Sequence, residues 1–519
     1  MRTGKSMNFA EYVLEEGLAY GGERTAVLFE DRELSYAQLA DQVYRFSAVL
    51  AQSGASRGDR IVVLMGNRPD YYMAYLGAAR AGVICATINI DYGLPEIAHM
   101  VRHADPLCIV ADRAGAEKYL SAIRDTGLQA VRILRVDDVT PGEAGEALQP
   151  MLARATPGPA TEVAGEDGVL LVFSSGSSGM PKPILTSHRG EIYAARSFRS
   201  MWRFNWNDRV LVSLALAWAY GIGTTSMPAL SAGATIVLTP KFRPDTVSAA
   251  IMKHRATVLV GVTTMFRMIA DYAADQPVAP DLRSLRLAMT GGEKRNEAVF
   301  ERFEALAGVP VHDIYAQSEI RPVFGYDPVA VERPLPGAAG QLFPGVEVRL
   351  VGEDGFPVPA GEPGELHARS PNTFLEYFRQ PELTAEKRSE DGWVRTGDMF
   401  RVDEAGFWYL LGRKSADVIN RGGVKISPNE IEEHLARHPH IRDVVVVPRT
   451  HERYGEEVVA CVVGAFVAEE LLGQIRAHCE GVLADYKIPT SAVLIDELIY
   501  SANGKVDRKA LAALAAKAA

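Results

Sequence analysis

Cysteine is scarce in this chain, with four residues among 519, and no two of them form a Cys-x-x-Cys pair. This scarcity indicates neither a zinc site nor a disulfide framework, and it favours free thiols in a reducing, cytoplasmic compartment. The eleven histidines show no His-Glu-x-x-His or similar metal-ligand spacing. The first twenty residues contain acidic side chains and lack a long apolar core, so no secretory signal is expected there.

An excess of basic residues is also missing. The 55 Lys and Arg residues are outnumbered by 65 Asp and Glu residues, which gives a net charge of −10. This balance argues against a nucleic-acid or anionic-membrane partner, because binding many phosphates needs clustered basic side chains. It does not argue against a small anionic ligand that is held in a local pocket.

One uncharged stretch, residues 210–238, is long enough to cross a bilayer. It is interrupted by glycine, proline and hydroxyl residues, among them Gly221, Gly223 and Pro228. We interpret it as a buried strand, a loop and a buried helix of an α/β domain, followed by a strand over residues 234–238. No membrane span is therefore expected.

Helix and strand signals alternate along the first two thirds of the chain. The pattern predicts a capped helix over residues 36–53, a strand over 60–65, a helix over 70–81 and strands over 85–90 and 107–110. This alternation is typical of a parallel α/β sheet. It resumes with a strand over 169–173 and runs to about residue 335, whereas the Pro/Gly/Ala-rich residues 140–165 are expected to form a surface connection.

The pattern changes twice in the last third. Short strands with Gly/Pro turns follow Gly345 and predict a β subdomain at about residues 340–412. Beyond Gly412, helices over 430–436 and 471–483 and strands over 444–447 and 458–467 predict a compact α+β unit. The expected fold class is α/β: a large N-terminal domain of parallel sheets with a small β subdomain, and a small α+β C-terminal domain.

A serine- and glycine-rich loop follows the predicted strand over 169–173. Backbone N–H groups, hydroxyls and one lysine can converge there on phosphate oxygens. The loop is neither a Walker A motif nor a nucleophile elbow, and its place after an apolar strand argues against a flexible linker. Its residues are Ser174, Ser175, Gly176, Ser177, Ser178, Gly179 and, after Met-Pro, Lys182.

Four further segments carry polar chemistry. The run of residues 315–319 offers an aromatic face, a hydroxyl and a carboxylate that could stack a base, contact a phosphate and hold Mg²⁺. Thr396-Gly397-Asp398 places a carboxylate in a tight turn, where it could accept from two ribose hydroxyls. The other two segments span residues 412–430, with a Gly-Gly pair, and residues 503–509, which by composition alone would be a solvated charge run.

Seen together in this order, the five segments resemble the adenylate-forming superfamily, which contains acyl- and aryl-CoA ligases, peptide-synthetase adenylation domains and luciferases. The resemblance covers nearly the whole chain, including Leu34-Ser35-Tyr36 and residues 75–78. It implies a large domain over residues 1–412, a hinge over 413–417 and a mobile C-terminal domain over 418–519.

The resemblance also implies a role for each motif. The loop from Ser174 to Gly179, with Lys182, would hold the ATP β- and γ-phosphates, and Lys505 would bridge the substrate carboxylate and the α-phosphate. Such a cation stabilises the charge that develops on phosphorus. Asp398 and Arg413 would hold the ribose. The remaining nucleotide-site residues would be Gly291, Gly292 and Glu293 at the adenine and substrate pocket, Tyr315 on adenine, its neighbours Ala316 and Gln317, Ser318 at the α-phosphate and Glu319 on Mg²⁺.

Two half-reactions follow from the resemblance: formation of an acyl-AMP with release of pyrophosphate, and then transfer of the acyl group. The C-terminal domain would rotate between them, and Gly422 and Gly423 would replace Lys505 and, with Trp218, form the thiol tunnel. The chain departs from the usual pattern at Ala316, Ser318 and Pro183, and its hinge is one residue longer, which leaves the pivot among Ser415, Ala416 and Asp417 open.

The acyl pocket of the family falls on a segment without charge. An aspartate near Ala219 would pair with the ammonium group of an amino acid, and none is present. The Ala-Tyr-Gly run resembles benzoate-type CoA ligases, and the run after Ile419 resembles aryl-acid ligases that load carrier proteins. The predicted pocket residues are Trp218, Ala219, Tyr220, Gly221, Phe266 and Gly292, and each could also be an ordinary core residue.

The sequence thus predicts a Mg·ATP-dependent aryl acid ligase that uses CoA and acts as a monomer or homodimer. A medium-chain or fatty acid, a pantetheinyl carrier protein and a non-thiol nucleophile stay open as alternative substrates or acceptors. A non-catalytic nucleotide-binding protein is the contrasting class, and retention of Lys182, Glu319, Asp398, Arg413 and Lys505 argues against it.

Overall fold

The computed structural model describes residues 7–174, 180–293, 295–359, 361–413, 419–421, 424–426, 428–452, 454–480, 482–483, 485–501 and 506–518. The chain divides into two compact units. The first comprises Met1–Arg295, Val299–Val348 and Ala368–Arg395, and the second comprises Asn296–Ala298, Arg349–His367 and Thr396–Ala519. Each unit is described separately.

The first unit contains a largely parallel sheet that ends in an antiparallel meander. Strands β1, β11, β10, β12, β13 and β14 run parallel, and the hairpins β1–β2, β14–β15 and β15–β16 are antiparallel. In spatial order the strands are β16 (Ala338–Leu342), β15 (Ile320–Gly325), β14 (Val311–Gln317), β13 (Leu287–Gly291), β12 (Val258–Gly261), β10 (Arg209–Val212), β11 (Thr235–Leu238), β1 (Thr25–Phe29) and β2 (Arg32–Ser35).

A second sheet of the same unit is parallel except at one edge. Strands β8 and β9 form an antiparallel hairpin, and β19 adds to β9 in antiparallel register. The order is β19 (Glu376–Tyr377), β9 (Lys182–Ser187), β8 (Gly168–Ser174), β4 (Ile84–Thr87), β3 (Arg60–Leu64), β5 (Cys108–Ala111), β6 (Arg132–Arg135) and β7 (Glu146–Ala147).

Helices cover these sheets and bury their apolar strands. Helices α4 and α5 pack on β3, β4 and β5, and α9, α10 and α11 pack on β10, β12 and β13. Helix α3 is buried along its whole length. The helices of this part of the chain are α1 (Phe9–Leu18), α2 (Tyr36–Gln52), α3 (Asp70–Arg80), α4 (Leu94–Ala104), α5 (Arg113–Thr126), α6 (Leu148–Arg154), α7 (His188–Met201), the π-helix η1 (Tyr220–Ser226), α8 (Met227–Ser231), α9 (Pro244–His254), α10 (Thr263–Ala274), α11 (Glu297–Ala307) and α12 (Pro381–Lys387).

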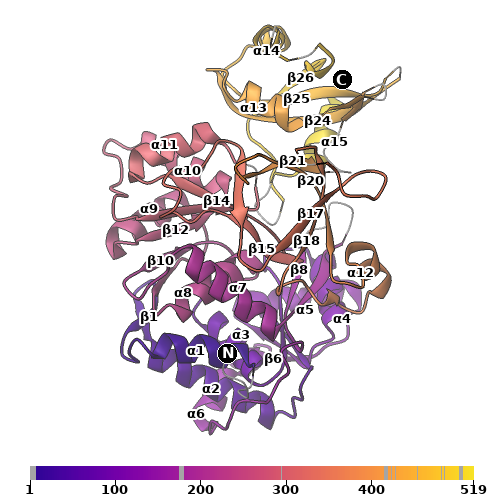
Figure 1. Cartoon of the computed structure of the whole chain (residues 1–519). Helices are drawn as coiled ribbons and strands as arrows, with labels where there is room; N and C mark the ends of the chain where they lie inside the picture. Colours follow the sequence, from indigo (N-terminus) through magenta and orange to yellow (C-terminus); the bar gives the residue numbers. More distant parts are fainter. Residues whose placement is uncertain are drawn as a thin grey trace. The chain divides into compact units, whose positions relative to one another are not determined.

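The remaining strands form two groups. Strands β17 (Glu347–Val351), β18 (Gly364–Arg369), β20 (Val394–Val402) and β21 (Trp408–Arg413) lie side by side in that order. The C-terminal sheet, orange to yellow in Figure 1, contains β23 (Val424–Ile426), β22 (Ile419–Arg421), β25 (Gly455–Gly464), β24 (Ile441–His451) and β26 (Ser491–Leu494). It carries α13 (Pro428–Leu435), α14 (Leu471–Cys479), the 3₁₀ turn η2 (Asp485–Lys487) and α15 (Arg508–Lys517).

The observed architecture confirms the predicted fold class, a large mixed α/β domain with a small α+β C-terminal domain. The uncharged residues 210–238 form the end of β10, η1, α8 and β11, as expected from their glycines and proline. Among the described residues, no helix is long and apolar enough to cross a membrane. One expectation was wrong: residues 140–165 are not only a surface connection, because they contain β7 and helix α6, which buries Leu148 and Leu152.

Candidate active site

The predicted phosphate loop connects the two strands of an antiparallel hairpin, β8 and β9. Ser174, the last residue of β8, lies directly opposite Lys182, the first residue of β9. Both residues are partly exposed, while the strands behind them are buried. Residues 175–179 of the predicted loop lie outside the described residues. The hairpin register therefore fixes the two ends of the loop and brings its single lysine beside its first serine.

Glu319 occupies the tip of a second hairpin. Gln317 in β14 pairs with Ile320 in β15, so that Ser318 and Glu319 form a two-residue turn. The preceding residues of β14 are buried, whereas residues 316–319 are all partly exposed. Tyr315 packs against Phe324 with ring centroids 5.7 Å apart, and its hydroxyl accepts a hydrogen bond from the Gln317 amide. The motif is thus presented at a hairpin tip by a buried strand.

Tyr377 joins these two hairpins. Its hydroxyl donates to Glu319 Oε1 at 2.6 Å, and Lys182 Nζ lies 5.6 Å from the centroid of its ring. Burial and the charge of Glu319 raise the pKa of this phenol well above its ordinary value, so it stays protonated and acts as the donor. Sequence reasoning missed Tyr377, because β19 is only two residues long and no local pattern marks it.

Glu319 fits the role of a magnesium ligand. Mg²⁺ is usually held by one or two carboxylates together with substrate phosphates and water. Glu319 supplies one such carboxylate at a partly exposed position, and only its Oε1 is hydrogen-bonded among the described residues. No group of three His, Cys, Asp or Glu side chains suited to an all-protein metal site occurs in the part of the chain that the structure describes. The single carboxylate of Glu319 suits a metal ion that arrives with a nucleotide.

The Gly-Gly-Glu segment ends β13. A Cβ at Gly291 would lie 2.6 Å from the Ile314 side chain, and Gly292 has a φ of +78°, so both positions require glycine. The Glu293 carboxylate accepts from the Thr264 backbone N–H at 2.9 Å and from its hydroxyl at 3.1 Å. Glu293 therefore holds the first turn of α10.

The uncharged segment predicted to line the acyl pocket is tightly constrained. A Cβ at Gly221 would lie 2.4 Å from the carbonyl oxygen of Ala215, which leaves room only for glycine. The Tyr220 hydroxyl donates to the Gly261 carbonyl at 3.1 Å, and Ala219 is buried. Trp218 is partly exposed, and its ring N–H has no hydrogen-bond partner among the described residues.

Phe266, predicted as a pocket residue or an ordinary core residue, packs against neighbouring aromatic side chains. It is fully buried on α10 and contacts Phe300 and Phe303 of α11, with a centroid distance of 4.8 Å to Phe303. This edge-to-face packing belongs to the core that α9, α10 and α11 build on the sheet. Its contacts are those of a core residue.

The predicted ribose pair lies on one ladder of the second unit. Asp398 in β20 is directly opposite Arg413 in β21. Asp398 is buried, and the preceding Gly397 has a φ of +75° and donates its N–H to the Glu365 carboxylate at 3.2 Å. The register thus brings together two residues that are fifteen positions apart in the sequence.

Several predicted residues cannot be placed. Lys505, Gly422, Gly423 and residues 414–417 of the predicted hinge lie outside the described residues.

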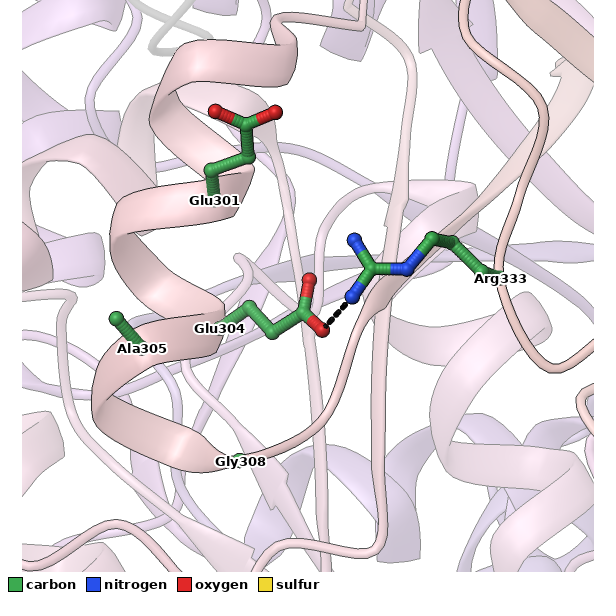
Figure 2. A pocket seen from close by; sticks show the side chains of 5 residues that line it. All are labelled: Glu301, Glu304, Ala305, Gly308 and Arg333. Atoms are coloured by element: carbon green, nitrogen blue, oxygen red, sulfur yellow. Dashed lines mark hydrogen bonds and ion pairs between the residues drawn. The ribbon is translucent and has the colours of Figure 1, made fainter.

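One open surface hollow of the first unit contains none of the predicted residues. It is lined by Glu301, Glu304, Ala305, Gly308 and Arg333 (Figure 2). Arg333 and Glu304 form an ion pair across it.

Family models match most of the chain. The model of the AMP-binding enzymes matches residues 14–378, and the model of the AMP-binding enzyme C-terminal domain matches residues 430–505. The two matches cover both the hairpins with Lys182 and Glu319 and the C-terminal α+β region.

Individual relatives match over almost their full length. The indoleacetate–CoA ligase of Aromatoleum aromaticum is 34% identical, covering 95% of this chain and 96% of that protein. The 3-hydroxybenzoate–CoA/4-hydroxybenzoate–CoA ligase of Thauera aromatica is 28% identical, covering 97% and 96%. The crystal structure of ATP-bound MatB from Rhodopseudomonas palustris has a TM-score of 0.88 at 25% identity and covers 99% of this chain and 100% of that chain. The chain therefore belongs to the AMP-binding enzymes of the adenylate-forming superfamily and is an AMP-forming acid ligase.

Proposed function

We propose that this ligase activates an aromatic carboxylic acid with Mg·ATP and transfers the acyl group to the thiol of CoA. The observation that carries the proposal is the grouping of Lys182 and Glu319 around Tyr377 at the ends of two hairpins. A lysine suited to phosphate oxygens and a carboxylate suited to magnesium are the two groups that bind the polyphosphate end of ATP.

In the first half-reaction, a carboxylate oxygen of the acid attacks the α-phosphorus of ATP. The bond from that phosphorus to the bridging oxygen of the β-phosphate breaks, and pyrophosphate leaves. Lys182 and the loop before it bind the departing phosphates, and Glu319 would hold a Mg²⁺ ion that would supply positive charge against them. Asp398 and Arg413 hold the ribose, and Lys505 stabilises the charge that develops at phosphorus.

In the second half-reaction, the CoA sulfur attacks the acyl carbon of the adenylate. A carbon–sulfur bond forms, the carbon–oxygen bond to AMP breaks, and the thiol proton is released to solvent. We propose that the region after residue 413 rotates between the two steps, so that Lys505 leaves and the Gly422–Gly423 segment approaches the thiol.

Two observations support an aromatic acid. The segment around Trp218 and Tyr220 offers aromatic side chains and contains no carboxylate to pair with an amino-acid ammonium group. The names of the relatives above, which are an indoleacetate ligase and a hydroxybenzoate ligase, point to the same class of acid.

The decisive experiment is a pyrophosphate-release screen of benzoates, hydroxy- and aminobenzoates, cinnamates, indoleacetate and fatty acids, each with and without CoA. We expect release with an aromatic acid and sustained turnover only when CoA is present. Release that is sustained without CoA would overturn the acceptor assignment, and a response to fatty acids alone would overturn the aromatic assignment. Lys505→Ala should nearly abolish ATP–pyrophosphate exchange with the preferred acid, and near-normal exchange would contradict its role.

A further inference from the structure

One short segment, residues 373–378, connects the β8–β9 hairpin, which contains Lys182, to the β14–β15 hairpin, which contains Glu319. The backbone N–H of Phe374 donates to the Glu319 carbonyl at 2.8 Å, and Thr373 forms a bridge with Ile320. A few residues later, Tyr377 pairs with Ile184 of β9, and Phe378 N–H donates to the Pro183 carbonyl at 2.7 Å. The segment is therefore fixed to both hairpins by its backbone.

The side chain of Tyr377 repeats this connection between the charged groups. Its hydroxyl donates a hydrogen bond to Glu319 Oε1, and the Lys182 ammonium lies over the face of its ring in a cation–π contact. Tyr377 itself is 2% exposed, so its position is fixed by packing, including the edge of Phe374 at a centroid distance of 5.0 Å. A rigid aromatic ring thus lies between one partly exposed anion and one partly exposed cation.

We propose that Tyr377 is a positioning residue that orients Glu319 toward the metal ion and Lys182 toward the phosphates of Mg·ATP. This inference rests on the proposed adenylation. The phenol occupies Oε1 and leaves Oε2 for the metal, and it fixes the plane of the carboxylate before the nucleotide binds. The ring attracts the lysine without neutralising it, so that its charge stays available to a phosphate.

The two functions of the side chain can be separated by substitution. Tyr377→Phe keeps the ring and removes only the hydroxyl, whereas Tyr377→Leu removes both. Tyr409→Phe is the matched control, because the Tyr409 hydroxyl also donates to a carboxylate, Asp403, at 2.9 Å, in the second unit. Melting temperatures of the three variants report any loss of folding.

The experiment measures ATP binding by titration calorimetry without an acid substrate, once with Mg²⁺ and once with EDTA. In the wild type, Mg²⁺ should tighten ATP binding. We expect Tyr377→Phe to reduce this tightening about tenfold and to leave metal-free binding unchanged, since a hydrogen bond to a charged group contributes that much. Tyr377→Leu should in addition weaken metal-free binding roughly two- to fivefold.

Kinetics supply a second readout. In ATP–pyrophosphate exchange, Tyr377→Phe should require a higher Mg²⁺ concentration for half-maximal rate, while the KM of the acid stays at the wild-type value. If Tyr377→Phe shows the same Mg²⁺ dependence as Tyr409→Phe while the wild type is active, the positioning role is wrong and the proposed function stands. If it weakens ATP binding equally with and without Mg²⁺, the role is only structural. If the wild type itself neither binds Mg·ATP nor exchanges, the proposed function fails and this inference fails with it.

Discussion

Glu319 and Arg321 are two residues apart on the β14–β15 hairpin, and their surroundings are opposite. Glu319 is partly exposed at the turn and is held by a neutral phenol. Arg321 is 2% exposed and pairs with Glu191 of α7, which is fully buried and also accepts from the Thr186 hydroxyl at 2.7 Å. The comparison shows that burial decides whether a charge can reach a substrate or only another part of the fold.

The buried pair is incompletely satisfied, which makes each partner depend on the other. Among the described residues, Nε and Nη1 of Arg321 and Oε2 of Glu191 have no hydrogen-bond partner. A Cβ at Gly223 would lie 2.9 Å from Nη2 of Arg321, so η1 packs directly on the pair. A buried charge without its partner is strongly destabilising, and this pair has few other contacts to replace a lost one.

The largest expected effect comes from breaking this pair. Arg321→Met should lower the free energy of unfolding by about 3–5 kcal/mol, because it leaves the Glu191 carboxylate buried and unpaired. Urea unfolding followed by circular dichroism measures the change.

Two further variants show whether burial is the cause. Arg302→Met breaks an exposed ion pair in which Arg302 Nη2 and Asp271 Oδ1 are 2.7 Å apart. It should lower the free energy of unfolding by no more than about 1 kcal/mol. Replacing Glu191 by Leu together with Arg321→Met should recover most of the lost stability, since an apolar pair of similar volume needs no charge partner. Equal losses for Arg321→Met and Arg302→Met would contradict the comparison.

Glu319→Gln tests the partly exposed residue of this comparison. The carboxamide oxygen can still accept from Tyr377, so stability should change by less than about 1 kcal/mol. The charge that would hold the metal is lost, however, and ATP–pyrophosphate exchange should fall by roughly 10²–10³. Exchange rates and melting temperature, measured on one preparation, separate the two effects. If Glu319→Gln lost stability and kept its exchange rate, Glu319 would have the structural role that is assigned to Arg321, and its assignment as a metal-binding residue would be wrong.

Local sequence signals predicted several helices and strands well. The Ser35–Gln38 capping box begins α2 where the sequence places it, and the predicted strands over residues 60–65 and 169–173 are β3 and β8. Such elements depend on spacing within a few residues. Helix α6 was missed because its short apolar face lies within a Pro/Gly-rich passage.

Long-range pairs were beyond the reach of the sequence. Tyr377 contacts Glu319 across 58 positions, and Arg321 contacts Glu191 across 130. Nothing in the spacing of these residues indicates that one pair is partly exposed and the other buried. The motif order led to Lys182 and Glu319 through resemblance, whereas the residue that connects them was found only in the fold.

The smallest expected effect concerns His188, the first residue of α7, the helix that also carries Glu191. His188 is fully buried, and its Nδ1 accepts from the Phe9 backbone N–H at 3.1 Å. Burial lowers its pKa from 6.5 to about 4, against the charge of Asp167, which raises it, while Arg57 lowers it further. Between pH 6.5 and about pH 4, His188 binds a proton more readily in the unfolded chain than in the folded one. The stability that comes from keeping His188 neutral is therefore complete above pH 6.5 and is lost as the pH falls toward 4.

When the pH falls from 7.5 to 5.5, protonation linked to His188 should therefore lower the free energy of unfolding by about 1.4 kcal/mol. His188→Gln keeps an acceptor for Phe9 and cannot be protonated, so its stability should fall less steeply over this range than that of the wild type. His440→Gln, at an exposed position, is the control and should keep the wild-type slope. Urea unfolding at the two pH values measures the difference. If His188→Gln followed the wild-type slope, burial on α7 would not govern protonation there, and the contrast between the interior of the fold and the hairpin tips would be limited to the Arg321–Glu191 pair.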